Sequence, residues 1–415
     1  MFDIDKWQEI LATISKNKLR TFLTAMSVAW GLYMLVFMLG AGSGLEHGIL
    51  RGFGDYATNS GEVWGRRTSM PYAGLQAGRY VSFTYRDMEI IRNKVKGIDL
   101  LAPHSNRSFL VSRSNKSESL QIRGDVPDLQ KIDPKNVSKG RFLNELDIKE
   151  KRKVVVIGRR AKQLLFDEEE EAIGDFVKIK GVFFKVVGIF QSKRNDEWAL
   201  EQEKNLYIPL PTMQQALTNN ERIDYFTFTA LPDVAVSDVE KAVKEELRKI
   251  HKVSPEDKNA IGSWNMEEEF AKIQGMFLGI NGLIWIVGVF TILAGVIGVS
   301  NIMLIVVKER TKEIGLRKAL GATPFSIISL IIQESVFITA MSGYVGLFFG
   351  IMVVDGIRYL VDEVAGGVSM FASPSIDGSV ALSALAFLVV SGMFAGILPA
   401  IKAAAVSPVE ALRDE

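Results

Sequence analysis

The chain has 415 residues, a hydrophobic content of 48% and a formal net charge of +1 at pH 7. This near-neutral balance gives no electrostatic reason to expect nucleic acid as a partner. The absence of cysteine excludes disulfides, thiolate nucleophiles and zinc–thiolate sites, and it suits a domain exposed to an oxidising compartment. The histidines, His47, His104 and His251, lack metal-ligand spacing, so we expect no metal site.

Residues 1–20 combine an apolar helical face with flanking lysines. Trp7, Ile10, Leu11 and Ile14 follow the spacing i, i+3, i+4 and i+7. This pattern predicts an amphipathic helix that lies on the cytoplasmic surface of a membrane.

Four long apolar segments follow in the chain. A membrane helix needs about 20 apolar residues to cross a hydrocarbon core of about 30 Å. The four segments that meet this length are Thr21–Gly42, Met276–Val307, Phe325–Val354 and Ser379–Ile401. We therefore predict transmembrane helices at 21–43, 271–307 (including a stalk), 325–354 and 379–402. The first run is too long to be the apolar part of a cleaved signal peptide.

Lysine and arginine set the expected orientation, because cytoplasmic flanks are rich in both residues. They concentrate before the first span, in the loop 308–324 and around the tail 403–415, whereas the short loop 355–378 is mainly acidic. We therefore expect both termini and the 308–324 loop in the cytoplasm, with the 355–378 loop on the periplasmic side of a multi-pass inner-membrane protein.

Residues 44–270 have an ordinary soluble composition and are expected outside the cytoplasm. Period-2 segments such as Tyr225–Thr229 predict strands, and helical spacing predicts helices near 84–96, 159–166 and 236–250. This mixture predicts a large α+β domain, inserted between the first and second spans and divided into subdomains near 110–225. The acidic run Asp167–Glu171 admits a metal site, but a solvated loop is the favoured interpretation.

The second span is longer than a bilayer requires. Its 32 uncharged residues would measure about 48 Å as a helix, and the preceding residues contain no helix breaker. We expect the helix to continue out of the membrane as a stalk. Gly-x3-Gly spacings at Gly275/Gly279, Gly346/Gly350 and Gly392/Gly396 indicate close helix packing, within one chain or between two.

The loop 308–324 is predicted to form a stiff helical corner. Oppositely charged residues recur at i,i+3 and i,i+4 spacing, Gly321 suits the end of a helix, and Thr323-Pro324 suits the start of the next. A docking element is favoured over a basic loop that only fixes topology. The candidate docking residues are Glu309, Arg310, Lys312, Glu313, Ile314, Gly315, Leu316, Arg317, Lys318 and Gly321.

Polar residues inside the spans form a second set of candidates. Glu334 lies about ten residues into the third span, where a charge must be paired, protonated or turned to a cavity. Two interpretations stay open, a coupling or dimer contact and a hydrogen-bonded residue that holds helices together. Asn301 is a second intramembrane polar position. Ser407, Pro408 and Glu410 have the form of a capping box that starts a short cytoplasmic helix.

No catalytic signature accompanies these features. The sequence contains no G-x4-G-K-[ST] phosphate loop, no H-E-x-x-H and no G-x-S-x-G. We expect no catalytic residue, no bound cofactor and no enzymatic activity in this chain.

Three segments resemble the MacB/FtsX-type ABC transporter permeases, the mechanotransmission class. They are the basic entry Lys16–Thr24, the stretch Asn301–Leu304 with Glu309–Ala322, and the tail Pro399–Ala404 with Ser407–Leu412. The second segment is specific, and the other two support it. The resemblance extends over essentially the whole length, including the four-span plan.

The resemblance implies a permease that pairs with a second copy or a close paralogue. It implies an external domain with a porter-like fold and a β-rich subdomain, and docking of residues 309–322 on a cytoplasmic ABC ATPase that binds ATP and Mg²⁺. Members named after MacB carry a fused N-terminal ATPase; here we expect a separate polypeptide. A periplasmic adaptor and an outer-membrane channel are candidate partners.

The resemblance to the MacB branch favours export of a drug, peptide or other periplasmic compound. Two alternatives stay open. One is a lipoprotein-releasing permease of the Lol type, and the other is an FtsX-type regulator of cell-wall hydrolases.

Overall fold

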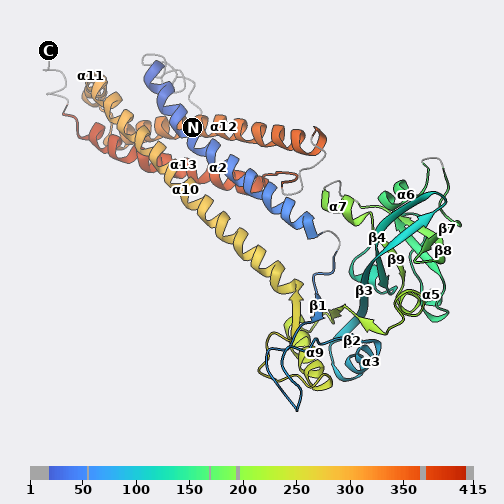
Figure 1. The fold of residues 1–415 in the computed structure, drawn as a ribbon. Helices are drawn as coiled ribbons and strands as arrows, with labels where there is room; N and C mark the ends of the chain where they lie inside the picture. The colour runs from blue at the N-terminus through green and yellow to red at the C-terminus, as the bar shows by residue number, and fades with distance from the viewer. Residues whose placement is uncertain (1–17, 54–55, 168–169, 193–196, 365–370, 408–415) are drawn as a thin grey trace. The chain divides into compact units, whose positions relative to one another are not determined.

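The computed structural model describes residues 18–53, 56–167, 170–192, 197–364 and 371–407. The chain divides into two compact units (Figure 1). The helical unit contains the chain up to Gly52 and from Met276 onward, and the outer unit contains Phe53–Gly275. The predicted interfacial helix falls within 1–20, of which residues 1–17 lie outside the described residues.

The helical unit is built from four helices that are long and apolar enough to cross a membrane. They are α2 (Lys18–Phe53), α10 (Met266–Glu309), α12 (Pro324–Tyr359) and α13 (Gly378–Ala405), with the short α11 (Thr311–Ala319) after α10 and a π-helical turn (Leu360–Val364) after α12. α12 and α13 pack along each other. A shared core holds residues of all four long helices, among them Leu32, Ile292, Ile331 and Leu388.

Close helix approach depends on particular glycines. A Cβ on Gly346 of α12 would lie 2.2 Å from the backbone oxygen of Ala29 in α2, too close for any side chain. A Cβ on Gly392 of α13 would likewise meet Thr339 of α12 at 2.6 Å. These two Gly-x3-Gly segments therefore pack within one chain. Among the described residues, nothing lies within 4 Å of a Cβ placed on Gly275 or Gly279.

Gly346→Ala tests this packing. The added methyl would push α2 away from α12, and we expect a loss of about 1–3 kcal/mol of unfolding free energy, the usual cost of overpacking. Gly356→Ala on the same helix is the matched control, because no described residue lies within 4 Å of a Cβ placed there. Since alanine is the better helix former, we expect it to be neutral or slightly stabilising. Denaturant unfolding of both variants in one detergent measures the difference.

The outer unit contains a ten-stranded sheet in the order β12-β1-β11-β3-β4-β9-β6-β8-β5, with β7 between β3 and β8. Its strands are β1 (Ser60–Gly65), β3 (Ile98–Arg113), β4 (Lys116–Asp125), β5 (Val137–Gly140), β6 (Val154–Gly158), β7 (Phe176–Ile179), β8 (Val182–Phe190), β9 (Leu206–Pro209), β11 (Tyr225–Ala230) and β12 (Ile261–Asn265). A two-stranded sheet pairs β2 (Phe83–Thr84) with β10 (Arg222–Ile223). The helices are α3 (Tyr85–Lys94), α4 (Leu129–Ile132), α5 (Glu145–Lys149), α6 (Arg159–Leu165), α7 (Glu197–Gln202), α8 (Leu210–Met213) and α9 (Val236–Ile250), with a π-helical turn at Gln214–Thr218.

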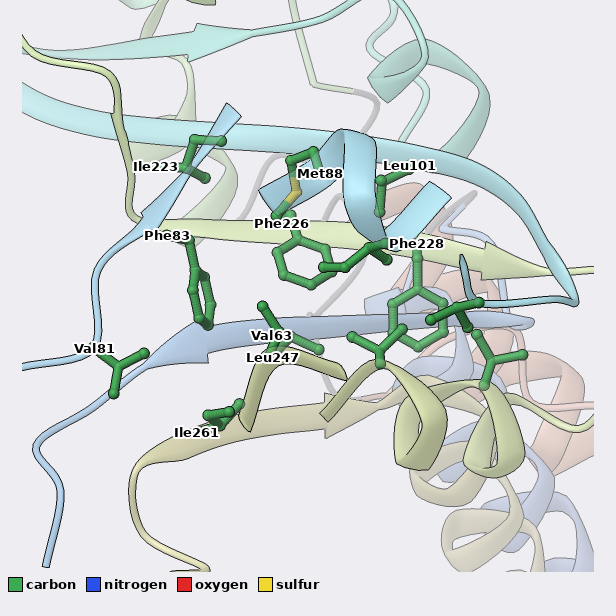
Figure 2. Packing of buried hydrophobic residues seen from close by; sticks show 14 of the residues in the cluster. Val63, Val81, Phe83, Met88, Leu101, Ile223, Phe226, Phe228, Leu247 and Ile261 are labelled. Atoms are coloured by element: carbon green, nitrogen blue, oxygen red, sulfur yellow. The ribbon is translucent and has the colours of Figure 1, made fainter. Parts of the chain in front are cut away.

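The outer unit has two main cores, one on each side of the division predicted near 110–225. In the first, Val63, Phe226 and Phe228 of β1 and β11 pack against Met88 of α3 and Leu247 of α9 (Figure 2). The second fills a closed ring of strands, because β3, β4, β9, β6, β8 and β7 pair in sequence and β7 returns to β3. Interior residues of the ring include Val111, Ile122, Val155, Ile179, Phe184 and Ile208.

The long strand β3 belongs to both halves. It pairs with β11 up to His104 and with β4 from Ser105 onward. His104 at this change of partner is buried, with its ring nitrogens on Asp125 and Thr227. This histidine is therefore a core residue with both ring nitrogens hydrogen-bonded. Among the described residues no cluster of acids and histidines could hold a metal.

Candidate docking segment between the second and third apolar helices

The segment begins where α10 stops at Glu309 and α11 starts at Thr311. Only Arg310 separates them, with a backbone conformation (φ −96°, ψ 14°) outside the helical range. The Thr311 hydroxyl donates to the carbonyl oxygens of Val307 (3.3 Å) and Lys308 (2.8 Å), the last carbonyls of α10. The Thr311 side chain thus links the start of α11 to the last turn of α10 across Arg310.

The segment ends in a tight, glycine-dependent stop. Gly321 has φ +99°, and its N–H donates to the Lys318 carbonyl at 3.1 Å. The Ala322 N–H donates to the Arg317 carbonyl at 3.0 Å, which completes a Schellman motif. Thr323 then caps α12, its hydroxyl accepting from the Ser326 N–H, and Pro324 follows at the first helical position. The predicted stop and restart are both confirmed.

An ion pair ties the corner to the third apolar helix. Arg310 Nη1 lies 3.3 Å from Glu334 Oε2, and these side chains are 15% and 3% exposed. Arg310 also contacts Glu313 (2.9 Å), which in turn contacts Arg317 at 2.9 Å. The predicted Glu313–Arg317 pair is therefore present. The partner of Glu334 was not foreseen, although antiparallel helices joined by a short corner bring an Arg after one span near an acid early in the next.

A lysine ties the same corner to the fourth apolar helix. Lys318 Nζ donates to the backbone oxygens of Ala404 and Val406, both at 2.7 Å. These carbonyls lie at the C-terminal end of α13, where helix carbonyls lack intrahelical partners and a cation is favourable. Through Arg310 and Lys318, the corner holds α10, α12 and α13 together.

The two faces of α11 differ. Ile314 and Gly315 are buried, with Ile314 in the core of the helical unit. Leu316, Leu320 and Phe325 are 51%, 80% and 78% exposed. Together with Arg317, the last two line a groove of about 560 Å³, whose other walls include Ala322, Ser326 and Gln333. Leu320 and Phe325 were not among the predicted docking residues. An aromatic residue directly after Thr323-Pro324 is the signal that could have found Phe325.

Apart from Arg317, the predicted site residues that the structure describes do not line this groove. Lys312 and Asn301 are exposed. Ser407 is half-buried, whereas Pro408 and Glu410 lie outside the described residues.

Two protein-family models match this chain. A model of the MacB-like periplasmic core domain matches residues 21–246, and a model of the FtsX-like permease C-terminal domain matches residues 285–408. The chain belongs to the MacB/FtsX family of ABC transporter permeases. The four apolar helices of this permease accordingly indicate a multi-pass inner-membrane protein.

Named relatives extend the match over nearly the whole permease. It is 27% identical to the macrolide export ATP-binding/permease protein MacB of Bdellovibrio bacteriovorus, over 97% of this chain and 60% of the relative. It is 27% identical to the pyoverdine export ATP-binding/permease protein PvdT of Pseudomonas entomophila, over 96% of this chain and 58% of the relative. The chain thus spans about 60% of the length of these relatives.

Solved structures give a weaker match. The periplasmic region of MacB from Actinobacillus actinomycetemcomitans covers 55% of this chain and 97% of its own, at 22% identity and a TM-score of 0.44.

Proposed function

We propose that this chain is the membrane subunit of an ATP-driven export system. In this proposal α11 and its flanks lie in the cytoplasm and dock on an ATP-hydrolysing ABC subunit, a separate polypeptide that binds ATP and Mg²⁺. Both termini share that side, and the outer unit lies in the periplasm. The groove carries the proposal, because it brings the exposed apolar side chains of Leu320 and Phe325 together with Arg317 at the corner that is proposed to face the cytoplasm.

The contacts of α11 explain how a movement of the docked ATPase would be transmitted to the long helices. Contacts through Arg310, Lys318 and Ile314 fix the segment to three long helices, so it would move them together. α10 is a single helix of 44 residues, about 66 Å long. A hydrocarbon core of about 30 Å takes up less than half of this length. The remainder supports the predicted stalk, by which movement of the corner would reach the periplasmic unit.

Further partners follow from the family. We propose that two permease chains act together, as a homodimer or with a close paralogue, and that a periplasmic adaptor and an outer-membrane channel complete an export route. The named relatives export a macrolide and pyoverdine. The proposed cargo is correspondingly a drug, a peptide or another compound taken up from the periplasm.

Measurements of ATP hydrolysis test whether the ATPase activity resides in a separate subunit. The purified chain in lipid nanodiscs should show no ATP hydrolysis above the empty-nanodisc background. Adding the co-expressed cytoplasmic ATPase should give turnover that differs from that of the ATPase alone. Sustained hydrolysis by the purified chain without a partner would reject the proposal, and so would an ATPase whose rate the chain leaves unchanged.

A further inference from the structure

The loop between β1 and β2, residues 66–82, exposes an unusual set of side chains for the outer unit. Met70, Tyr72, Leu75 and Tyr80 are between 39% and 46% exposed. Pro71 and Ala73, between them in the chain, are exposed as well. The tip of this β1–β2 loop is therefore a partly exposed apolar and aromatic surface, on which Arg222 stacks over the Tyr80 ring at 4.6 Å.

A buried carboxylate fixes the base of the tip. Asp257 is 1% exposed. Its Oδ2 accepts from the backbone N–H groups of Ser69 (2.7 Å) and Met70 (3.3 Å), and its Oδ1 accepts from the Ser69 hydroxyl at 2.7 Å. Oδ1 also accepts from the N–H groups of Asn259 (3.0 Å) and Ala260 (3.2 Å). Five donors thus hold one acid, and that acid holds the loop.

These hydrogen bonds also lower the pKa of Asp257 and so determine the pH at which the carboxylate stops holding the loop. Burial would raise the pKa of Asp257, but the hydrogen bonds from Ser69 and the neighbouring backbone outweigh burial and leave the pKa below its usual value. A lowered pKa in the folded state means that the anchor is complete above the unfolded value of about 3.9. It is lost only as the pH falls further, so the loop is held throughout the neutral range.

Backbone pairing keeps the rest of the β1–β2 loop in one conformation. The Thr68 N–H donates to Arg79 O (2.9 Å), and Tyr72 and Leu75 exchange N–H···O bonds of 3.0 and 2.9 Å. Between Tyr72 and Leu75 lie Ala73 (φ +50°) and Gly74 (φ +80°), a pair with positive φ as in a type I′ hairpin turn. The apolar tip is therefore presented by a preformed hairpin, and binding would cost little ordering entropy.

The rim of the loop is positively charged. Residues 66–82 contain Arg66, Arg67 and Arg79 and no acidic residue. Arg79 donates to the Lys252 backbone oxygen at 2.7 Å, which joins the base of the hairpin to a neighbouring loop that carries Lys252, Glu256 and Lys258. A surface of this kind is complementary to an acidic one.

The strand register locates the loop within the outer unit. β1 and β12 are antiparallel, with Gly61 opposite Asn265 and Gly65 opposite Ile261. The chain arrives from α2 at the Gly61 end of β1, and it leaves toward α10 at the Asn265 end of β12. The β1–β2 loop starts at the other end of this strand pair. The loop therefore lies at the end of the β1–β12 pair away from both connections to the long helices.

We propose that the β1–β2 loop is a docking surface for an extracytoplasmic protein that presents acidic residues around an apolar depression. The apolar tip would enter the depression, and the arginines would face the acidic rim. This inference concerns the end of the outer unit opposite its connections to α2 and α10, and it does not depend on docking at α11.

Crosslinking in cells identifies what the loop touches. A photoreactive phenylalanine analogue replaces Tyr72 in the full chain, and a second variant carries it at Leu110, an exposed residue of β3 that serves as control. We expect a crosslinked protein of acidic pI from position 72 and not from position 110. Crosslinks to lipid or to a second copy of this chain, equal yields from both positions, or no crosslink at position 72 would each overturn the proposal.

Binding of the purified partner then tests the chemistry. The double variant Tyr72→Ser/Leu75→Ser in nanodiscs should bind the crosslinked protein at least tenfold more weakly than the unaltered chain, and Leu110→Ser should bind equally well. Affinity should fall between 50 and 500 mM salt, because the rim contributes through charge. Asp257→Ala keeps the tip residues but frees the hairpin, and it should also weaken binding. A binding affinity that changes neither with salt nor with the tip substitutions would contradict the proposal.

Discussion

Arg310→Ala is expected to destabilise the helical unit by about 3–5 kcal/mol, the usual cost of removing one member of a buried ion pair. The substitution removes the guanidinium that lies 3.3 Å from the Glu334 carboxylate, which is 3% exposed. Denaturant unfolding in nanodiscs, followed by tryptophan fluorescence, measures the effect.

Two further variants distinguish the effect of breaking a buried ion pair from the effect of removing an arginine whose ion pair is exposed. Arg317→Ala removes a pair with Glu313 whose side chains are 33% and 40% exposed, so its cost should stay within about 1 kcal/mol. Replacing Arg310 and Glu334 together by methionine removes both members of the buried pair and should recover most of the stability. Equal losses for Arg310→Ala and Arg317→Ala would show that the Glu334 pair does not secure the corner.

Leu320→Ser/Phe325→Ser is expected to weaken binding of the cytoplasmic ATPase about 30-fold, which corresponds to about 2 kcal/mol for the loss of an interface anchor. Both side chains are largely exposed and line the groove, so their truncation should change folding stability little. The dissociation constant, measured with the chain in nanodiscs, gives the result directly.

The matched control for this pair lies in the outer unit. Leu110→Ser/Phe183→Ser truncates two side chains that are also largely exposed, and it should leave ATPase affinity unchanged. An ATPase that binds the Leu320→Ser/Phe325→Ser variant with unaltered affinity would place the docking surface elsewhere. The same variant should bind the extracytoplasmic partner of the β1–β2 loop normally, so the two proposals can fail separately.

Features that depend on local chemistry could be predicted from the sequence. The stop at Gly321 and the restart at Thr323 follow from the left-handed conformation that glycine adopts readily and from the side-chain cap that threonine supplies. Helix α9 follows from apolar residues at helical spacing and was placed at its observed bounds. The apolar helices stand out for the same reason, since length and composition alone identify them.

Features that depend on residues distant in sequence could not be predicted. The donation from Lys318 to the end of α13 joins residues 86 positions apart, and no local pattern encodes it. Closure of the strand ring through β7 also depends on long-range register. The exposed β1–β2 loop was missed because its anchor, Asp257, lies nearly 190 residues from Ser69.

The membrane sides of α11 and the outer unit test the account most directly. The chain has no cysteine, so single thiols can be introduced at Ala319 and at Leu110, both exposed. With a membrane-impermeant maleimide on intact spheroplasts, we expect labelling at position 110 and none at position 319 until the membrane is permeabilised. Equal labelling of both positions in intact spheroplasts would contradict a cytoplasmic corner that moves a periplasmic unit.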